Sequence, residues 1–268
     1  MKRVKGMALG EWKTFLIPYK QAVEELKVKF RSIRKEYREK NEYSPIEFVT
    51  GRVKEISSIL EKANKFNIPL DRISYEMEDI AGIRIMCQFT SDIEKVVELV
   101  RQRRDMQIIY EKDYITNVKN SGYRSYHMII KYPVSMAEGQ KEILAEFQIR
   151  TLAMNFWATI EHSLNYKYKH QIPKDIKLKL KSAADAASNL DKLMMEIKDE
   201  IKDAQKLFEV KSSLVSYIMD NILTLQSMGK IIDSNRYQEQ LNKLIEEGEV
   251  FELNSLLKST EKTIEMYK

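Results

Sequence analysis

Carboxylates and aromatic side chains gather in the middle of this chain at positions where a folded core has no need of them. Asp79 stands just before an apolar segment, and Glu146 lies inside another, EILAEFQIR (142–150). Between them, SGYRSYH (121–127) places two tyrosines, an arginine and a histidine after a glycine. Two carboxylates can hold Mg²⁺, which prefers hard oxygen ligands and leaves coordination positions for phosphate oxygens. These residue types therefore indicate chemistry on a phosphate-bearing ligand.

Nearby segments supply the cations that such a ligand needs. They are Arg52, Lys54, Lys62, Lys65 and Arg84. On a helix of 3.6 residues per turn, the three lysines fall within roughly 80° of one another. Cations neutralise charge that develops on a transferred phosphoryl group, and a tyrosine or arginine can stack on a base. Because the sequence holds neither a Walker-type phosphate loop nor a kinase-type glycine loop, side chains would have to hold the nucleotide. The residues alone predict a nucleotide-dependent transferase.

Alternation along the expected strands places these residues on a surface. In 142–150 the odd positions are apolar and should face a helical layer, whereas Glu146, Gln148 and Arg150 share the other face. A face that met only water would look the same. Two neighbouring segments also carry polar faces, formed by Tyr123, Ser125 and His127 and by Arg84 and Gln88. A sheet with one face devoted to a ligand therefore fits better than a solvated one.

The sequence predicts a small mixed sheet flanked by many helices, an α/β (α+β) architecture. A first helix should cover 11–40, where apolar residues recur at helical spacing. SPIEF (44–48) has capping-box spacing and predicts a helix start before a basic helix at roughly 51–66. A central block of about 79–150 should hold the strands around a capped helix at 91–104. The expected strands are 83–89, 107–115, 123–132 and 142–150, and the later helices are 151–169, 174–209, 213–228, 235–247 and 250–267.

Composition and charge bound the class of protein. Of 268 residues, 43% are hydrophobic and 32% are charged, as in an ordinary globular protein with a core. We expect a first domain at 1–210 and a helical C-terminal extension of unknown role at 211–268. The extension carries seven Lys and Arg against nine Asp and Glu, and the rest of the chain carries 38 against 31. That surplus suits small phosphate-bearing ligands and is too modest for a dedicated DNA-binding surface.

The compartment is expected to be the reducing cytoplasm. A single cysteine, Cys87, falls within an apolar strand pattern, so core packing is its expected role. The sequence shows no apolar run long enough to span a membrane and no signal peptide.

Four motifs in this order resemble the small alarmone synthetases of the RelA/SpoT superfamily, of the stand-alone RelQ type. They are SPIEFVTGRVK (44–54), EDIAGIRIMCQF (78–89), SGYRSYH (121–127) and EFQIRTLAMNFWATIEHSLNYKY (146–168). The resemblance covers roughly residues 11–209 and implies a nucleotidyltransferase-like sheet of the synthetase type. It also implies one reaction, in which the β,γ-pyrophosphate of ATP moves to the 3′-hydroxyl of GTP or GDP. The products would be pppGpp or ppGpp, the signals of the stringent response, and AMP.

The resemblance also implies a role for each candidate residue. Asp79 and Glu146 would bind Mg²⁺, and Glu146 would activate the 3′-hydroxyl as a general base. The ATP site would comprise the adenine-stacking pair Arg52 and Arg84 and the phosphate-binding Lys54, Lys62 and Lys65. The acceptor site would comprise Tyr123, which stacks on guanine, with Lys119, His127 and Gln148.

Regulation is implied by the same resemblance. RelQ-type relatives are homotetramers whose central cleft binds pppGpp as an allosteric activator, and they bind single-stranded RNA as an inhibitor. The positions that match the cleft are Lys27, Arg31, Phe48, Thr50 and Asn155. Phe48 could instead be plain core, and Lys27 and Arg31 could form a solvated helix face.

Some features depart from the family pattern. KANK (62–65) holds lysine where relatives are commonly richer in arginine, and lysine lacks the bidentate fork for phosphate. Residues 211–268 match nothing in the pattern and could cover an interface, bind a partner or extend the helical layer. The chain leaves no room for an upstream hydrolase domain and holds no His-Asp dipeptide, so we expect synthesis only.

Two other functions remain open at this point. One is a catalytically silent alarmone- or RNA-binding regulator on the same fold, although a silent relative would not need both Asp79 and Glu146. The other is a nucleotidyltransferase on a related sheet that releases pyrophosphate instead of AMP.

Overall fold

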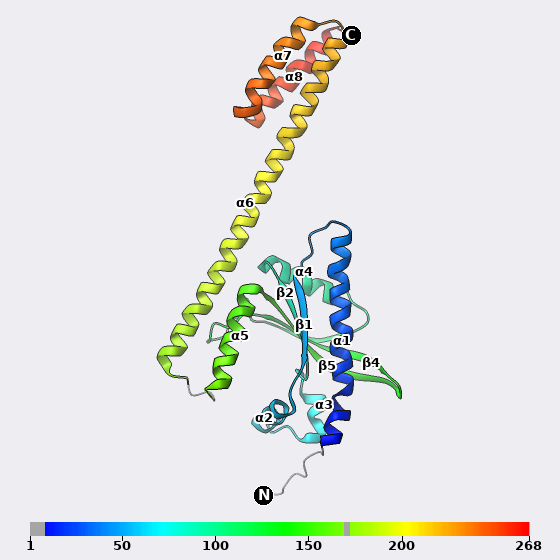
Figure 1. Cartoon of the computed structure of the whole chain (residues 1–268), viewed down its shortest axis with the longest axis vertical. Coiled ribbons are helices and arrows are strands. Elements are labelled where there is room, and N and C mark those ends of the chain that lie inside the picture. Colours follow the sequence, from blue (N-terminus) through cyan, green and yellow to red (C-terminus); the bar gives the residue numbers. More distant parts are fainter. Residues whose placement is uncertain (1–8, 169–171, 268) are drawn as a thin grey trace. The chain divides into compact units, whose positions relative to one another are not determined.

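The computed structural model describes residues 9–168 and 172–267 of the chain (Figure 1). Contacts divide the chain into two compact units, Met1–Met195 and Glu196–Lys268. This division lies N-terminal to the expected boundary between residues 210 and 211. The division into a synthetase domain and an extension, which concerns function, stays a prediction.

A five-stranded mixed sheet forms the centre of the first unit, in the spatial order β1-β2-β5-β4-β3. The strands are β1 (Phe48–Val53), β2 (Ala81–Cys87), β3 (Gln107–Asp113), β4 (Tyr126–Met136) and β5 (Gly139–Thr151). β2 and β5 run parallel, whereas the pairs β1/β2, β4/β5 and β3/β4 are antiparallel. The predicted mixed α/β fold class is therefore confirmed.

One face of this sheet is apolar and packs against helices α1 (Leu9–Glu39) and α4 (Thr90–Arg101). The odd residues of β5 from Ile143 to Ile149 are buried there, as alternation predicts. Phe30 of α1 packs edge-on against Phe147, with ring centroids 5.0 Å apart. The even residues of β5 consequently face the opposite side.

The segment before β2 corrects one prediction. SPIEF does not start a helix, because residues 48–53 pair with β2 and place Val49 opposite Ile85. The Ser44 hydroxyl accepts a hydrogen bond from the backbone of Ile46, only two residues on, at 3.2 Å. A local capping signal has been overridden by pairing with a strand more than thirty residues away. The basic helix begins later, as α2 (Ile56–Phe66).

The remaining helices follow the prediction in part. Helices were expected at the places of α5 (Leu152–Lys167), α6 (Lys174–Ser227), α7 (Ile231–Glu247) and α8 (Val250–Tyr267), and α8 has the expected bounds. The 3₁₀ turn Leu70–Arg72 and the short helix α3 (Ile73–Glu76) were not predicted. α6 is one helix of 54 residues, so the expected break after residue 209 is wrong. Residues 210–213 hold neither glycine nor proline, and nothing there ends the helix. Residue 169, the expected end of α5, lies outside the described residues.

Gly122 accounts for the late start of β4. This strand was expected from residue 123 and begins at Tyr126. Gly122 has a φ of +88°, and a Cβ added there would lie 2.5 Å from Cβ of Ala184 in α6. A glycine is therefore required where the chain turns against α6, and Tyr123 belongs to this turn.

The second unit has a small core of its own. Ile218, Ile222 and Leu225 of α6 pack there with Leu241 of α7 and Leu253 of α8. The helices expected in the C-terminal segment are thus present, the first of them as the end of α6. Among the described helices of the whole chain, none combines the length and the apolar character needed to cross a lipid bilayer.

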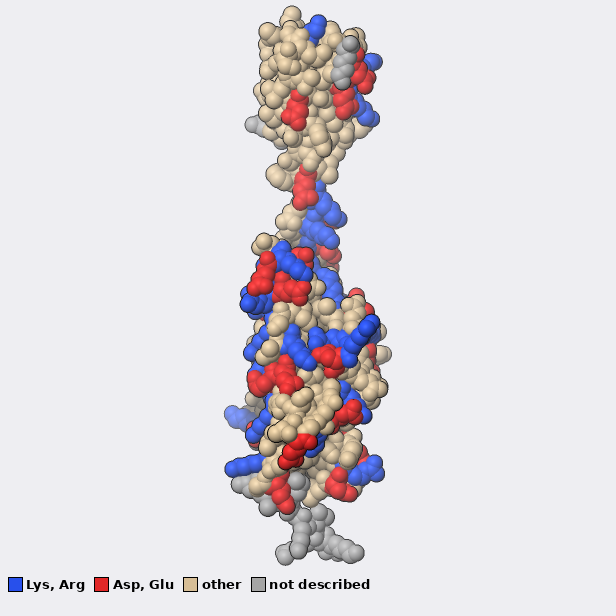
Figure 2. Space-filling model, turned by 90° about the vertical axis from the view of Figure 1, so that its right-hand side faces the viewer, with Lys and Arg blue, Asp and Glu red and all other residues tan. Residues whose placement is uncertain are grey.

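Charge is mixed on the surface of the first unit. On the face shown in Figure 2, Lys and Arg are interspersed with Asp and Glu. This agrees with the modest surplus of positive charge in the sequence.

Candidate active site

Strand pairing aligns one residue from each strand into a polar row across the sheet. In the order β1, β2, β5, β4 and β3, the row is Thr50, Arg84, Gln148, His127 and Lys112. Because side chains alternate along a strand, the row lies on the face opposite the apolar core. Three residues predicted to bind nucleotides, Arg84, Gln148 and His127, are thereby brought side by side.

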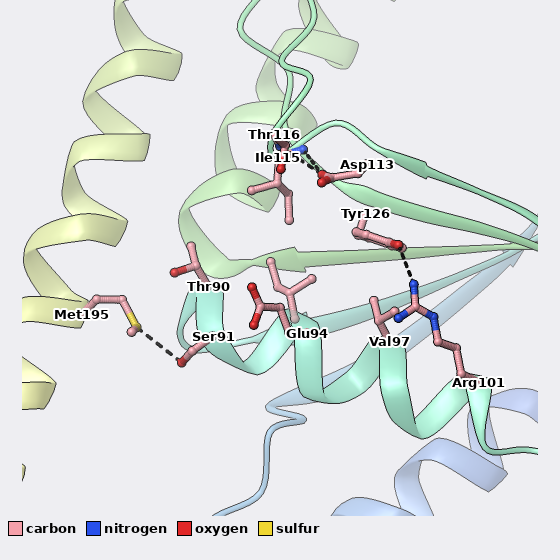
Figure 3. Close-up of a pocket in the computed structure, with 11 residues that line it drawn as sticks. Thr90, Ser91, Glu94, Val97, Arg101, Asp113, Ile115, Thr116, Tyr126 and Met195 are labelled. Atoms are coloured by element: carbon pink, nitrogen blue, oxygen red, sulfur yellow. Dashed lines mark hydrogen bonds between the residues drawn. The ribbon is translucent and has the colours of Figure 1, made fainter.

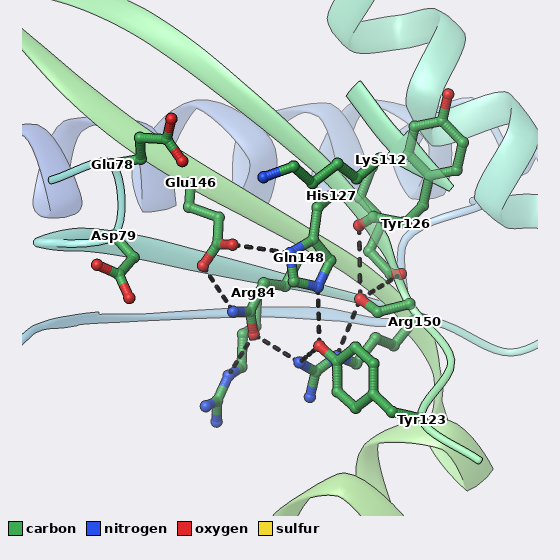
Figure 4. Close-up of polar contacts among 12 residues, drawn as sticks. Glu78, Asp79, Arg84, Lys112, Tyr123, Tyr126, His127, Glu146, Gln148 and Arg150 are labelled. Carbon is green, nitrogen blue, oxygen red and sulfur yellow. Dashed lines mark hydrogen bonds and ion pairs between the residues drawn. The ribbon is translucent and has the colours of Figure 1, made fainter. Parts of the chain in front are cut away.

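Asp79 and Glu146 add two carboxylates beside this row. Asp79 stands two residues before β2, and Glu146 lies opposite Gly82 on the neighbouring strand. Figure 4 shows both side chains on the same face of the sheet. Only 22% of the Asp79 side chain and 13% of the Glu146 side chain are exposed. Residues 67 positions apart in the sequence therefore present two carboxylates to one site.

Two lysines hold the carboxylate of Asp79. Nζ of Lys54 lies 2.8 Å from Oδ2, and Nζ of Lys62 lies 2.9 Å from Oδ1. Burial acts to raise the pKa of Asp79, but the hydrogen bonds and charges of Lys54 and Lys62 outweigh it and lower the pKa below its ordinary value. Asp79 is therefore ionised at neutral pH.

Glu146 is held on both of its oxygens. Nδ1 of His127 lies 2.7 Å from Oε1, and Nε2 of Gln148 donates to Oε2 at 2.7 Å. Burial acts to raise the pKa of Glu146, but these two hydrogen bonds outweigh it and lower the pKa. The carboxylate is thus ionised and fixed in orientation, which suits a base that must accept a proton from a bound hydroxyl.

The donor set fits a magnesium ion. Both carboxylates are hard oxygen donors, and the charge of Asp79 acts to raise the pKa of Glu146, a repulsion that a bound cation would relieve. Within the part of the chain that the structure describes, no group of three or more His, Cys, Asp or Glu could hold a metal by itself. Water and phosphate oxygens would therefore complete the coordination of a Mg²⁺ at this site.

The other predicted ATP-binding residues differ in how closely they approach this site. Nε of Arg84 donates to Oε1 of Gln148 at 3.3 Å. Burial lowers the pKa of Arg84, and the positive charges of Arg150 and Arg52 lower it further, so Arg52 is a close electrostatic neighbour. Lys65 is exposed, and its ammonium lies 5.6 Å from the ring centroid of Phe66. Of the three lysines, Lys65 alone has no described contact with Asp79.

The predicted acceptor residues form an aromatic and cationic cluster. Nζ of Lys119 lies 4.9 Å from the ring centroid of Tyr123 and 4.1 Å from that of Tyr114. The Tyr123 ring meets the His127 imidazole edge-on, and the Tyr123 hydroxyl lies 2.8 Å from Nε2 of His127. Burial raises the pKa of Tyr123, so its hydroxyl is neutral. Tyr114 was not singled out in the sequence, where one tyrosine among fourteen carries no signal of its own.

Arg150 is a further residue of this polar face to which the sequence analysis assigned no role. Its side chain is almost fully buried, at 4% exposure, and lies on the same face as Glu146 and Gln148. It donates to Oη of Tyr123 at 2.5 Å and to Oε1 of Gln148 at 2.7 Å. Alternation placed Arg150 on this face, and a buried arginine needs partners, but the sequence did not show which ones.

Four of the five residues predicted to bind pppGpp lie on the edge strand β1 or on helix α1, which contacts it. β1 is an edge strand, and by alternation Phe48 and Thr50 share the face of Arg84. Lys27 and Arg31 come from α1, where Nη2 of Arg31 donates to the carbonyl of Val49 at 3.1 Å. The Phe48 side chain is 37% exposed, so it is not a core residue of this chain. Asn155 lies on α5, apart from the other four in sequence, and its buried Oδ1 accepts no hydrogen bond within the described residues.

A cavity of about 400 Å³ lies elsewhere on the first unit (Figure 3). Its lining residues are Thr90, Ser91, Ile93, Glu94, Val97, Arg101, Asp113, Ile115, Thr116, Tyr126 and Met195. None of them is a predicted site residue. This cavity is therefore separate from the candidate active site, despite its size.

Comparison with known proteins gives the family. The model for the region found in RelA and SpoT proteins matches residues 51–171. The GTP pyrophosphokinase YjbM of Bacillus subtilis is 56% identical over 201 residues, which are 75% of this chain and 95% of that protein.

Two solved structures share both fold and sequence with this chain. A GTP pyrophosphokinase family protein from Streptococcus pneumoniae has a TM-score of 0.70 at 56% identity, over 75% of this chain and 98% of that one. The small alarmone synthetase 1 of Bacillus subtilis, bound to its product pppGpp, has a TM-score of 0.69 at 57% identity, over 71% and 97%. The chain therefore belongs to the RelA/SpoT family, among its small alarmone synthetases of the RelQ type.

Proposed function

We propose that this protein is a GTP diphosphokinase that transfers the β,γ-pyrophosphate of ATP to the 3′-hydroxyl of GTP or GDP. One observation carries the proposal: Asp79 and Glu146 face one site, with Lys54, Lys62 and Arg84 beside them. Its family relatives named GTP pyrophosphokinase support the same reaction. The products are pppGpp or ppGpp and AMP, and the synthesis serves stringent-response signalling.

In the proposed mechanism the chain positions two nucleotides and accepts one proton. The 3′-hydroxyl of the acceptor gives its proton to Glu146 while its oxygen bonds to the β-phosphorus of ATP. The bond between that phosphorus and the α,β-bridging oxygen breaks, and AMP leaves with the oxygen. Asp79 and Glu146 would hold Mg²⁺, which supplies positive charge next to the phosphates. Positioning and charge stabilisation supply most of the rate enhancement in such a transfer.

The substrates divide between the two ends of the polar row. Arg52 and Arg84 stack on adenine, while Lys54, Lys62 and Lys65 bind the ATP phosphates. Tyr123 stacks on guanine, and Lys119, His127 and Gln148 bind the rest of the acceptor. The groups at the proposed site serve synthesis, and no part in hydrolysing the product is proposed for them.

The test is anion-exchange chromatography after incubation with ATP, GDP and Mg²⁺. AMP and ppGpp should appear together with the wild type and be lost with Glu146→Gln, which keeps the shape of the side chain. Glu142→Gln is the matched control, because Glu142 lies on the same strand with an exposed side chain. Release of pyrophosphate instead of AMP would indicate a different nucleotidyltransferase. Intact nucleotides with the wild type would indicate a silent binder.

Regulation by the product is proposed for the edge of the sheet at β1. A homotetramer would enclose Lys27, Arg31, Phe48, Thr50 and Asn155 in a cleft that binds pppGpp. The exposed Phe48 ring and the buried Oδ1 of Asn155, which has no hydrogen-bond partner among the described residues, are consistent with a ligand there. Added pppGpp should speed synthesis from GTP, and Phe48→Ala should abolish this effect without abolishing synthesis.

Two further proposals concern inhibition by RNA and the location of the protein in the cell. Single-stranded RNA should inhibit synthesis, and the positive charge of the first 210 residues allows that contact. Adding an unstructured RNA to the assay tests this, because the inhibition should weaken as salt is raised.

A cytoplasmic location is proposed from the single, buried Cys87, and imaging of the tagged protein in the cell would check it.

A further inference from the structure

Arg150 joins the two sides of Glu146 through a closed ring of hydrogen bonds (Figure 4). On one side, Nη2 of Arg150 contacts the hydroxyl of Tyr123 at 2.5 Å, and that hydroxyl lies 2.8 Å from Nε2 of His127. On the other side, Nη2 contacts Oε1 of Gln148 at 2.7 Å. His127 and Gln148 each reach one oxygen of Glu146, at 2.7 Å. We call these five residues the Arg150 network.

The chemistry of the groups gives this ring a direction. Ionised Glu146 can only accept hydrogen bonds, so the imidazole of His127 carries its hydrogen on Nδ1. With a neutral imidazole, Nε2 then accepts from the hydroxyl of Tyr123, whose oxygen accepts from Arg150. In the same way, the amide NH₂ of Gln148 donates to Glu146 while its oxygen accepts from Arg150. Both lines of donors begin at Arg150 and end at Glu146.

The burial and the partners of the Arg150 guanidinium support this role. Only 4% of it is exposed, and its Nε donates to the buried Oγ of Ser125 at 3.1 Å. No ion pair with a carboxylate is described for Arg150 in residues 9–168 and 172–267. Burying a charged guanidinium costs free energy unless its N–H groups are hydrogen-bonded and its charge is balanced. Here neutral oxygens accept the hydrogen bonds of Arg150, and the balancing negative charge is that of Glu146, which His127 and Gln148 connect to the network.

We infer that Arg150 is a positioning residue for the proposed transfer. By holding Gln148 and Tyr123, it fixes both oxygens of the Glu146 carboxylate, the tautomer of His127 and the plane of the Tyr123 ring. Glu146 and the Tyr123 ring are thus both oriented through Arg150, with Arg84 as a second donor to Oε1 of Gln148. This inference rests on the proposed function, because it assigns Arg150 a part in that reaction.

The decisive variant is Arg150→Lys, which keeps the charge but lacks the Nε–H that donates to Ser125, and whose side chain is one bond too short to place its ammonium where Nη2 of Arg150 contacts Tyr123 and Gln148. The kcat for ppGpp synthesis should fall about 100-fold, as for other residues that orient a catalytic group. The KM for ATP should stay at its wild-type value. Arg124→Lys is the matched control, because Arg124 donates to the carbonyls of Gly122 and Ala184, away from Glu146. Its kcat should remain near that of the wild type, and the melting temperatures of the two variants should be similar.

A second readout needs neither nucleotide nor metal. The ¹⁵N shifts of the His127 imidazole should report hydrogen on Nδ1 in the wild type and in Arg124→Lys. In Arg150→Lys and in Tyr123→Phe, which keeps the ring and removes only the hydroxyl, a population with hydrogen on Nε2 should appear. If Arg150→Lys does not fold, Tyr123→Phe decides, with a loss of kcat and the change of tautomer both expected.

The inference is overturned if Arg150→Lys, or failing that Tyr123→Phe, turns over like Arg124→Lys while His127 keeps its tautomer. A wild type that makes no AMP would refute the proposed function instead. In that case the ¹⁵N shifts still decide whether Arg150 organises the network.

Discussion

The ammonium of Lys54 lies 2.8 Å from Oδ2 of Asp79 and ties the end of β1 to the loop that enters β2. The backbone repeats this link, since the amide of Lys54 donates to the carbonyl of Ile80 at 2.8 Å. Lys62 of α2 pairs with the second oxygen of Asp79. Asp79 is thus the point where the end of β1, helix α2 and the loop that enters β2 meet.

Replacing Asp79 with Asn should abolish most of the synthetase activity. The substitution removes a hard anionic ligand for Mg²⁺ and leaves Lys54 and Lys62 without their partner. We expect a loss of about 100-fold or more in kcat at saturating ATP and a higher Mg²⁺ concentration for half-maximal rate. Initial rates measured across a series of Mg²⁺ concentrations would check both, with Asp71→Asn, on the exposed 3₁₀ turn, as control. An unchanged Mg²⁺ dependence would contradict the assignment of Asp79 as a ligand.

Lys62 and Lys65 should contribute unequally to ATP binding. Lys62 already lies in the site against Asp79, whereas Lys65 is exposed and rests on the ring of Phe66. Lys62→Ala should raise the KM for ATP about 10-fold, the effect of losing one charged hydrogen bond. Lys65→Ala should raise it less. Steady-state kinetics on the two variants would check the order, and equal effects would mean that Lys65 swings onto the phosphates when ATP binds.

An ion-pair cluster at the other side of the sheet predicts a pH dependence of stability. Hydrogen bonds from Arg103 outweigh burial and, with those from Lys29, lower the pKa of Asp105 to about 2. A carboxyl whose pKa is lower when folded stabilises the protein above its unfolded pKa of about 4. This stabilisation is lost as the pH falls from there through the folded value.

The free energy of unfolding should therefore differ most between the wild type and Asp105→Asn at neutral pH. The difference should shrink as the pH drops below about 4. Urea denaturation at several pH values would measure it. Glu39→Gln is the control, because that exposed carboxyl near the end of α1 should show little difference at any pH. If the difference in the free energy of unfolding between the wild type and Asp105→Asn stays constant with pH, the ion pairs of Asp105 with Arg103 and Lys29 do not stabilise the fold.

A substitution in the core of the second unit should lower the stability of that unit without changing the rate of synthesis. Leu241 is completely buried in its core, so Leu241→Ala should cost about 2–5 kcal/mol of the free energy of unfolding of this unit. Ile245, on the same helix and 53% exposed, provides the control Ile245→Ala. Hydrogen exchange of α7 and α8 would measure the destabilisation, and the rate of ppGpp synthesis should stay at the wild-type value. A parallel loss of synthesis would show that the second unit supports the active site.

Local patterns in the sequence predicted much of the fold. Alternation in 142–150 correctly assigned the buried and polar faces of β5, because a strand exposes every second side chain to the same surroundings. Spacing in 11–40 predicted α1 to within two residues at each end. SPIEF misled, since its capping signal is local whereas β1 is formed by pairing with β2. The length of α6 was missed for a different reason: residues 210–213 hold neither glycine nor proline, but the lack of a helix-ending residue does not by itself show that a helix continues.

The sequence by itself determined which groups could form the site: two carboxylates, a set of cations and the aromatic residues that follow Gly122. It determined the face of Arg84, His127 and Gln148 as well, because the direction of a side chain follows from its position in a strand. Only the tertiary structure decided that Arg150 contacts both Tyr123 and Gln148, and that Lys62 rather than Lys65 pairs with Asp79. Such contacts depend on which strands become neighbours and in which register, and the energy that selects them comes from burial of the whole core.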